Sequence, residues 1–188
     1  MKRIRLLICL IVLAPQTSRA ESLSAVEGHY RVDPSSTIRF SVAQLGGQAI
    51  EGTFTQFSGS FRLAGAEASA SSVAFTLAPG SVRAADPRIE DFIKSDTVFA
   101  VETYPQVSFR STSVKRTGED TAVINGRLTA KGVTRDSRFD IRFLGRTGSA
   151  LKFHVTGKMS RALFHMDVGT PIYSNMVVLD MDLIGRPE

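Results

Sequence analysis

Apolar and polar residues alternate with a period of two along much of the chain. In one such stretch Ile38, Phe40 and Val42 alternate with polar residues at positions 37, 39 and 41. A similar alternation is present over residues 57–63, 73–77, 139–143, 151–155 and 177–183. Because successive side chains of a β-strand point to opposite faces, this pattern predicts strands with one apolar and one polar face.

Strands with one apolar face, in a chain with little predicted helix, indicate an antiparallel sheet that encloses a single interior. Residues typical of turns or bulges lie between or beside these strands, namely Gly46-Gly47, Gly65, Asn125-Gly126 and Gly148. We therefore expect an all-β fold, either a barrel or a two-layer sandwich, with up-and-down topology.

The periodicity changes around Asp86. Asp86-Pro87 is a typical helix start, and Ile89, Phe92 and Ile93 would then share one side of the helix. We predict one short amphipathic helix over about residues 87–94 that caps an end of the barrel. Residues 64–72 are rich in Ala and Ser and are predicted to form a long hairpin loop.

The N-terminus has the three parts of a secretory signal. Basic residues precede an apolar run from Leu6 to Ala14, and Ser18-Arg19-Ala20 places small residues at both key positions of a cut before Glu21. The run is nine residues long, whereas a membrane-spanning helix needs about 20. We predict a cleavable signal peptide at residues 1–20 and one mature domain at residues 21–188. An uncleaved anchor and a lipid-modified Cys9 are the less favoured alternatives.

Removal of the signal changes the charge and the cysteine content. Four of the 23 basic residues lie in residues 1–20, so 19 basic and 18 acidic residues remain. A near-neutral chain lacks the concentrated basic excess of a nucleic-acid binder, and no nucleic-acid partner is expected. Cys9 is the single cysteine, so the mature domain has no disulfide and no cysteine metal site.

Several segments of the chain form a pattern that recurs, in this order, in one known family. They are Tyr30-Arg31-Val32-Asp33-Pro34 followed by Ile38-Arg39-Phe40-Ser41-Val42; Glu51-Gly52-Thr53-Phe54 with Phe57-Ser58-Gly59; Ile93-Lys94-Ser95 followed by Tyr104-Pro105-Gln106-Val107-Ser108-Phe109; and Gly126-Arg127-Leu128-Thr129-Ala130-Lys131-Gly132-Val133-Thr134. The chain thereby resembles the YceI-like family, periplasmic lipocalin-like proteins that bind polyisoprenoid lipids.

This resemblance implies a single antiparallel lipocalin-like β-barrel of about eight strands with one short helix. It also implies a location in the periplasm of a Gram-negative bacterium. Two departures from the family pattern concern histidines that family members commonly carry. Ser35-Ser36-Thr37 stands where one of them is expected after Asp33-Pro34, and Phe92 stands in place of the other. In addition, His165 replaces a Gly next to Phe164.

The 12 phenylalanines lie mostly on the predicted inward faces. For any one of them a place in a packed core is the simpler interpretation, but a small barrel can also hold one ligand. The resemblance favours a cavity. The candidate lipid-binding residues are Phe40, Val42, Phe54, Phe61, Phe75, Phe109, Phe139, Phe153 and Phe164. Each buried methylene contributes about 0.8 kcal/mol and association costs about 4–15 kcal/mol, so a long chain is favoured over a small ligand.

Catalytic and metal sites find less support. The chain has no Gly-x-Ser-x-Gly turn, and its three histidines show neither His-x-His nor His-Glu-x-x-His spacing. His154 is expected on a polar face, and Asp180 and Asp182 alternate with apolar residues, which directs them outward. No catalytic residue, metal or cofactor is therefore expected. His165 and Tyr173 are the polar residues best placed for a hydrogen bond at a pocket mouth.

The sequence and the resemblance together predict a non-enzymatic periplasmic carrier of an isoprenoid lipid or quinone. Transient membrane contact and a homodimer are both compatible with that role. The main alternative is a secreted interaction or stress protein whose barrel is filled by its own side chains. A hydrolase acting on a lipid-like substrate comes third.

Overall fold

A computed structural model describes residues 22–188 of the chain; the predicted signal peptide and its cleavage site lie outside these residues. The strands are β1 (Glu27–Val32), β2 (Thr37–Gln44), β3 (Ile50–Phe54), β4 (Phe57–Ala64), β5 (Ser72–Leu77), β6 (Val82–Ala84), β7 (Val107–Arg116), β8 (Thr121–Ala130), β9 (Val133–Thr147), β10 (Ala150–Ser160) and β11 (Tyr173–Pro187). The helices are α1 (Pro87–Lys94) and four 3-10 turns, η1 (Leu23–Ala25), η2 (Ala68–Ala70), η3 (Pro79–Ser81) and η4 (Arg161–Phe164). No helix in this part of the chain is long and apolar enough to cross a bilayer.

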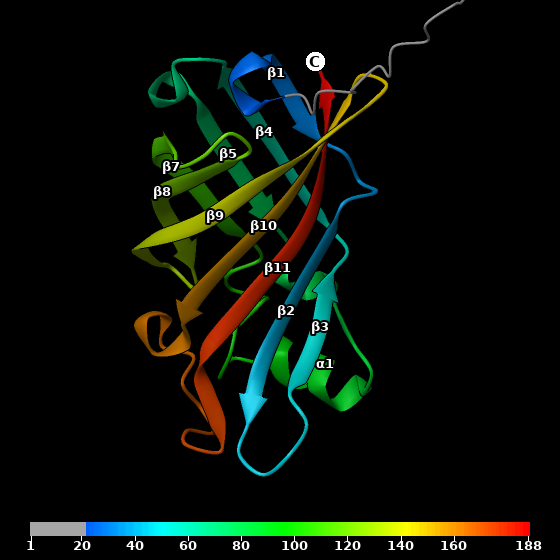
Figure 1. Cartoon of the computed structure of the whole chain (residues 1–188). Helices are drawn as coiled ribbons and strands as arrows, with labels where there is room; N and C mark the ends of the chain where they lie inside the picture. Colours follow the sequence, from blue (N-terminus) through cyan, green and yellow to red (C-terminus); the bar gives the residue numbers. More distant parts are fainter. Residues whose placement is uncertain (1–21) are drawn as a thin grey trace, which may run out of the picture.

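The strands form one antiparallel sheet that closes on itself (Figure 1). The ring runs β1-β4-β5-β7-β8-β9-β10-β11 and returns to β1, which gives eight positions. Three positions hold two strands each: β2 continues the position of β1, β3 that of β4 and β6 that of β5, because β2 pairs with β11 and β3, and β3 pairs with β6. Each position therefore neighbours the next one in sequence, so the all-β, single-barrel, up-and-down prediction is confirmed.

The seam of the barrel lies where the chain bends between β1 and β2. Pro34 interrupts the strand there, and one backbone and one side-chain hydrogen bond join the bend to Ile184 of β11. Asp33 N donates to Ile184 O at 2.7 Å, and Ile184 N donates to the Ser36 hydroxyl at 2.9 Å. The Asp33 carboxylate accepts from the Ser35 hydroxyl and backbone N–H and from Arg186, and these bonds lower the pKa of Asp33 to about 2.

The predicted strand faces are confirmed by burial. In β2, Ile38, Phe40 and Val42 are all buried, whereas the alternating residues lie on the outer face. The same alternation holds in β10, where Phe153 and Val155 are buried. Burial of each such side chain stabilises the fold by roughly 1.5–3 kcal/mol. A shift of the strand register by one residue would expose all of them to solvent.

Side-chain hydrogen bonds cap helix α1 at both ends. The Asp86 side chain accepts from Arg88 N at 2.9 Å, Pro87 occupies the first turn, and the Ser95 hydroxyl donates to Phe92 O at 2.7 Å. Ile93 is buried in the core. The prediction of a helix over residues 87–94 is confirmed, and the helix covers one end of the barrel (Figure 1).

The opposite end of the barrel is covered by η1. Leu23 N donates to Glu119 O in the β7–β8 turn at 3.2 Å, and the Leu23 side chain is buried in the core. The predicted hairpin loop over residues 64–72 connects β4 and β5 and contains η2. We call the two ends of the barrel the α1 end and the η1 end.

Asn125-Gly126 lies inside β8, opposite a bulge in β7 between Ser111 and Ser113. A Cβ atom at Gly126 would lie 2.3 Å from Arg110 O and 2.5 Å from the Phe109 ring. Glycine is thus needed here for the close approach of an aromatic ring to the backbone. The turn between β8 and β9 uses Lys131 and Gly132, both with positive φ.

We expect Gly126→Ala to destabilise the barrel by about 1–3 kcal/mol, because the added methyl group overlaps a backbone carbonyl that cannot move freely. Gly80→Ala is the matched control, since a Cβ there would meet nothing within 4 Å. Denaturant unfolding of both variants measures the difference. Equal stability of the two variants would contradict the close packing at Gly126.

Candidate functional site

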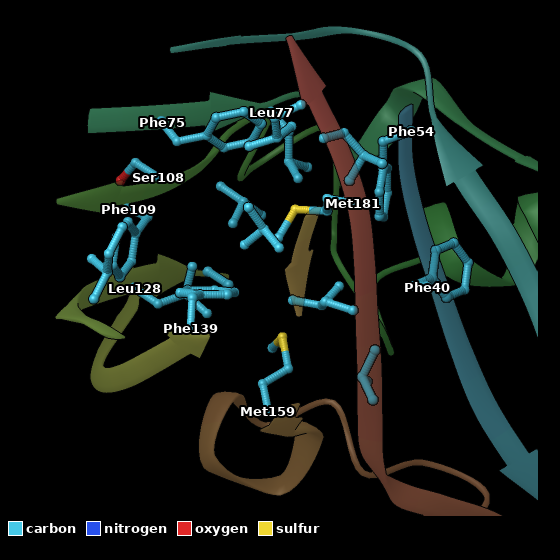
Figure 2. A pocket seen from close by; sticks show the side chains of 18 of the residues that line it. Phe40, Phe54, Phe75, Leu77, Ser108, Phe109, Leu128, Phe139, Met159 and Met181 are labelled. Atoms are coloured by element: carbon cyan, nitrogen blue, oxygen red, sulfur yellow. The ribbon is translucent and has the colours of Figure 1, made fainter. Parts of the chain in front are cut away.

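The barrel encloses an apolar cavity of about 240 Å³. Its wall draws residues from nearly every strand, from α1 and from the segment that follows α1 (Figure 2). Among the described residues that form the wall, four are polar: Ser71, Ser108, Tyr173 and Arg161. The Ser108 oxygen points away from the centre of the cavity (Figure 2). A cavity lined in this way favours an apolar guest over water.

Eight of the nine predicted lipid-binding residues lie in the cavity wall. They are Phe40, Val42, Phe54, Phe61, Phe75, Phe109, Phe139 and Phe153. Phe164 does not line the cavity; it is 1% exposed and packs in a second cluster with Met166 and Val98. The structure thus makes Phe164 a packing residue beside the cavity.

Several aromatic rings of the wall support one another. Phe40 and Phe54 have centroids 5.3 Å apart, and Phe109 lies edge-on to Phe139 at 5.0 Å. Such pairs hold each ring in place against its neighbour. Inward-facing aliphatic residues, among them Ile141 and Leu179, remain only partly buried although they point into the barrel. They face open space, and the interior is not filled by side chains.

Two groups of wall residues were not predicted from the sequence. The aliphatic residues Ile141, Val177 and Leu179 carry the same period-two signal as the phenylalanines and were identifiable from it. Phe92 and Phe99, in and after α1, enter the wall because the helix folds over the barrel end. The predicted amphipathic face of the helix includes Phe92, whereas no local sequence signal places Phe99 in the wall.

Arg161 is the other residue that the sequence analysis missed. It is 7% exposed, and its guanidinium donates to four backbone carbonyls, those of Met166 (2.6 Å), Val168 (3.2 Å), Tyr173 (3.2 Å) and Ser174 (2.9 Å). Burial lowers its pKa from the ordinary value. The charge of Asp167 opposes this decrease in the pKa of Arg161. Arg161 therefore holds the chain between η4 and β11 in one shape.

The two polar residues proposed for a pocket mouth differ in position. Tyr173 lines the cavity, whereas His165 is exposed and absent from the wall. The His165 carbonyl accepts from Lys131 Nζ at 3.1 Å. Tyr173 is thus the one of the pair that can meet a ligand inside the barrel.

A polar cluster lies on the outer face of β2, β10 and β11. Arg39 donates to Asp180 and to Asp182, the latter at 2.6 Å, and His154 bonds Asp182 at 3.0 Å. Asp180 and Asp182 point outward as predicted. The hydrogen bonds from Arg39, and then from His154, lower the pKa of Asp182. His154 and the two carboxylates have ligand atoms within 4.8 Å of one another, but Arg39 already supplies their positive charge.

Comparisons with known proteins agree on one family. A family model described as the YceI-like domain matches residues 30–184. The chain is 33% identical over 136 residues to a UPF0312 protein of Pseudomonas putida (strain GB-1), and the match covers 71% of each chain. It is 29% identical over 151 residues to the protein YceI of Salmonella arizonae, over 76% of this chain and 78% of that protein.

Solved structures show the same fold. Burkholderia cenocepacia BcnA superimposes with a TM-score of 0.75 at 24% identity, over 81% of this chain and 98% of that one. A polyisoprenoid binding domain from Saccharophagus degradans superimposes with a TM-score of 0.69 at 13% identity, over 87% of this chain and 100% of that one. At these identities the likeness concerns the fold alone.

Adjacent positions of β10 test which face lines the cavity. We expect Phe153→Asp to destabilise the protein by at least about 3 kcal/mol, because it places an unpaired carboxylate in the apolar interior. His154→Ser, one residue along on the outer face, should change the free energy of unfolding by no more than about 1 kcal/mol. Thermal or denaturant unfolding compares the two. A larger loss for His154→Ser would mean that the register is wrong.

The outer cluster should give a small, pH-dependent stabilisation. Because the folded state lowers the pKa of Asp182, its contribution is present above the ordinary value of 3.8 and is lost as the pH falls through the lower folded value. Asp182→Asn should therefore be less stable than the natural protein at neutral pH, with the gap closing in acid. Unfolding curves across this range measure it. A gap that does not change with pH would exclude the ionised pair as the cause.

Proposed function

The chain belongs to the YceI-like family, and we propose that it is a periplasmic carrier that holds the isoprenoid chain of a lipid or quinone inside its barrel. The main support for this proposal is the apolar cavity of about 240 Å³ inside the barrel. A packed core would leave no such space. One water molecule needs about 10–15 Å³ of such space. The cavity is thus many times larger than a packing defect.

The chemistry of the wall favours a chain over a polar ligand. Phenylalanine, leucine, valine, isoleucine and methionine make up most of it, and Arg161 already donates to four carbonyls. A hydrocarbon chain needs no hydrogen bonds, so it can occupy this space without leaving polar groups unpaired. The polyisoprenoid binding domain with the same fold supports this ligand class by analogy.

The protein should exchange its lipid rather than store it permanently, because the bilayer competes with the barrel for the isoprenoid chain. Each buried methylene contributes about 0.8 kcal/mol against water, but a bilayer offers the chain an equally apolar environment. The net preference then depends on how closely the wall packs around the chain and on the head group. A protein of this kind takes up and releases lipid at membranes.

The main alternative, an interaction or stress protein with a filled barrel, predicts an interior without a ligand-sized void. The cavity favours the carrier over that alternative. The proposed role is binding, not catalysis. A hydrolase would need a nucleophile and a base within hydrogen-bond reach of a substrate in the cavity, and the wall consists mainly of hydrocarbon side chains.

We expect the protein, isolated from its native periplasm without detergent, to carry an isoprenoid molecule that organic solvent extracts. Mass spectrometry identifies the molecule, and the native mass gives the stoichiometry per chain or per homodimer. Ile141→Phe should reduce the lipid content because it adds bulk inside the cavity, whereas Arg142→Phe adds it outside and should not. An empty extract from a folded, natural-sequence protein would overturn the proposal.

A further inference from the structure

Four exposed apolar side chains gather at the α1 end of the barrel, and we call them the apolar rim. They are Leu45 (77% exposed), Leu163 (50%), Val168 (37%) and Ile172 (53%). Leu45 follows the end of β2, Leu163 lies in η4 after β10, and Val168 and Ile172 precede β11. Since β10, β11 and β2 are neighbours in the sheet, these loops lie side by side (Figure 1).

The loops that carry the rim are held in shape by hydrogen bonds of their own. Leu45 N donates to Ile172 O at 2.8 Å, which joins the two loops. The buried guanidinium of Arg161 donates to the carbonyls of Met166 and Val168. The Thr170 hydroxyl donates to Asp167 O at 2.7 Å. Backbone groups bonded within the protein lose little on leaving water, so these loops suit an apolar environment.

The rim is continuous with the cavity wall. Ile172 is followed directly by Tyr173, which lines the cavity, and Val42 and Ile50 line it on either side of the loop that carries Leu45. A lipid chain that crosses this end of the barrel passes from the rim onto the wall without meeting a charged surface formed by these loops.

The loops that carry the rim hold few charges, and one cation from a neighbouring turn, Lys131, donates to the His165 carbonyl. The loop over residues 45–49 has no charged residue, and the segment from η4 to β11 has His165 and Asp167 on its surface, since Arg161 is buried. A surface of this kind attaches by inserting apolar side chains rather than by attracting anionic head groups. Protruding loops fit a fluid bilayer, whereas a rigid protein partner requires a broad complementary face.

We propose that the apolar rim inserts into the surface of a phospholipid bilayer and thereby presents the α1 end of the cavity to the membrane. This inference rests on the proposed function, because a lipid carrier must reach the bilayer that supplies its ligand. It adds the surface through which the contact is made.

The test is flotation of the mature protein with phosphatidylcholine vesicles that contain no isoprenoid. The natural sequence should float with the vesicles, and high salt should not release it. The double variant Leu45→Ser with Ile172→Ser should lower the partition coefficient by about tenfold or more, since each change removes a large apolar side chain from the contact. Leu144→Ser is the matched control, because Leu144 is 55% exposed and lies toward the η1 end.

Loss of binding in the double variant with retention in Leu144→Ser supports the proposal. Equal binding by all three proteins, equal loss in both variants, release by salt, or no binding by the natural sequence overturns it. Self-association that the double variant abolishes, without vesicle binding, would assign the rim to a second copy of the chain and also overturn it. Solvent extraction of the periplasmic protein separates the two proposals: an isoprenoid in the extract without vesicle binding refutes the rim alone.

Discussion

The closed ring of backbone hydrogen bonds is the constraint on which the rest of the structure depends. β11 pairs with β10 along one edge and with β2 and then β1 along the other, so one strand completes the ring. An open edge would leave unpaired N–H and C=O groups that need water or another chain. Closure removes that need within the ring, and the interior can then be almost entirely apolar without being completely filled.

The seam between β1 and β2 shows how sequence departures serve this closure. Pro34 cannot donate a backbone hydrogen bond. Ser36 accepts from Ile184 N, while Ser35 and Arg186 hold the Asp33 carboxylate. Ser35 and Ser36 stand where the family resemblance led us to expect a histidine, and here they stabilise the backbone at the seam. These two serines thus act on the backbone at the seam, whereas Phe92, another departure from the family pattern, lies in the cavity wall.

The same strands carry two independent environments, because alternate side chains point to opposite faces. In β11, Leu179 and Met181 face the cavity, whereas Asp180 and Asp182 form the outer cluster with Arg39 and His154. The sheet separates the two sets, so charge on the outside does not enter the binding site. For the proposed carrier, ligand selection would consequently depend on the shape of the apolar wall and on the end of the barrel that admits the chain.

Local patterns in the sequence determined the faces of the strands, the all-β class and the limits of α1, because alternation and helix caps act within a few residues. The family resemblance, and not these patterns, favoured a barrel over a sandwich. Eight of the nine candidate residues lie in the wall; six of them belong to the alternating stretches, whereas Phe54 and Phe109 belong to segments that carry the family resemblance. Tertiary structure decided that Phe164 packs beside the cavity, that Phe92 and Phe99 enter its wall, and that Arg161 is buried among four carbonyls. It also brought Leu45 next to Ile172. These positions depend on contacts between residues far apart in the chain, which ring closure creates and no local pattern encodes.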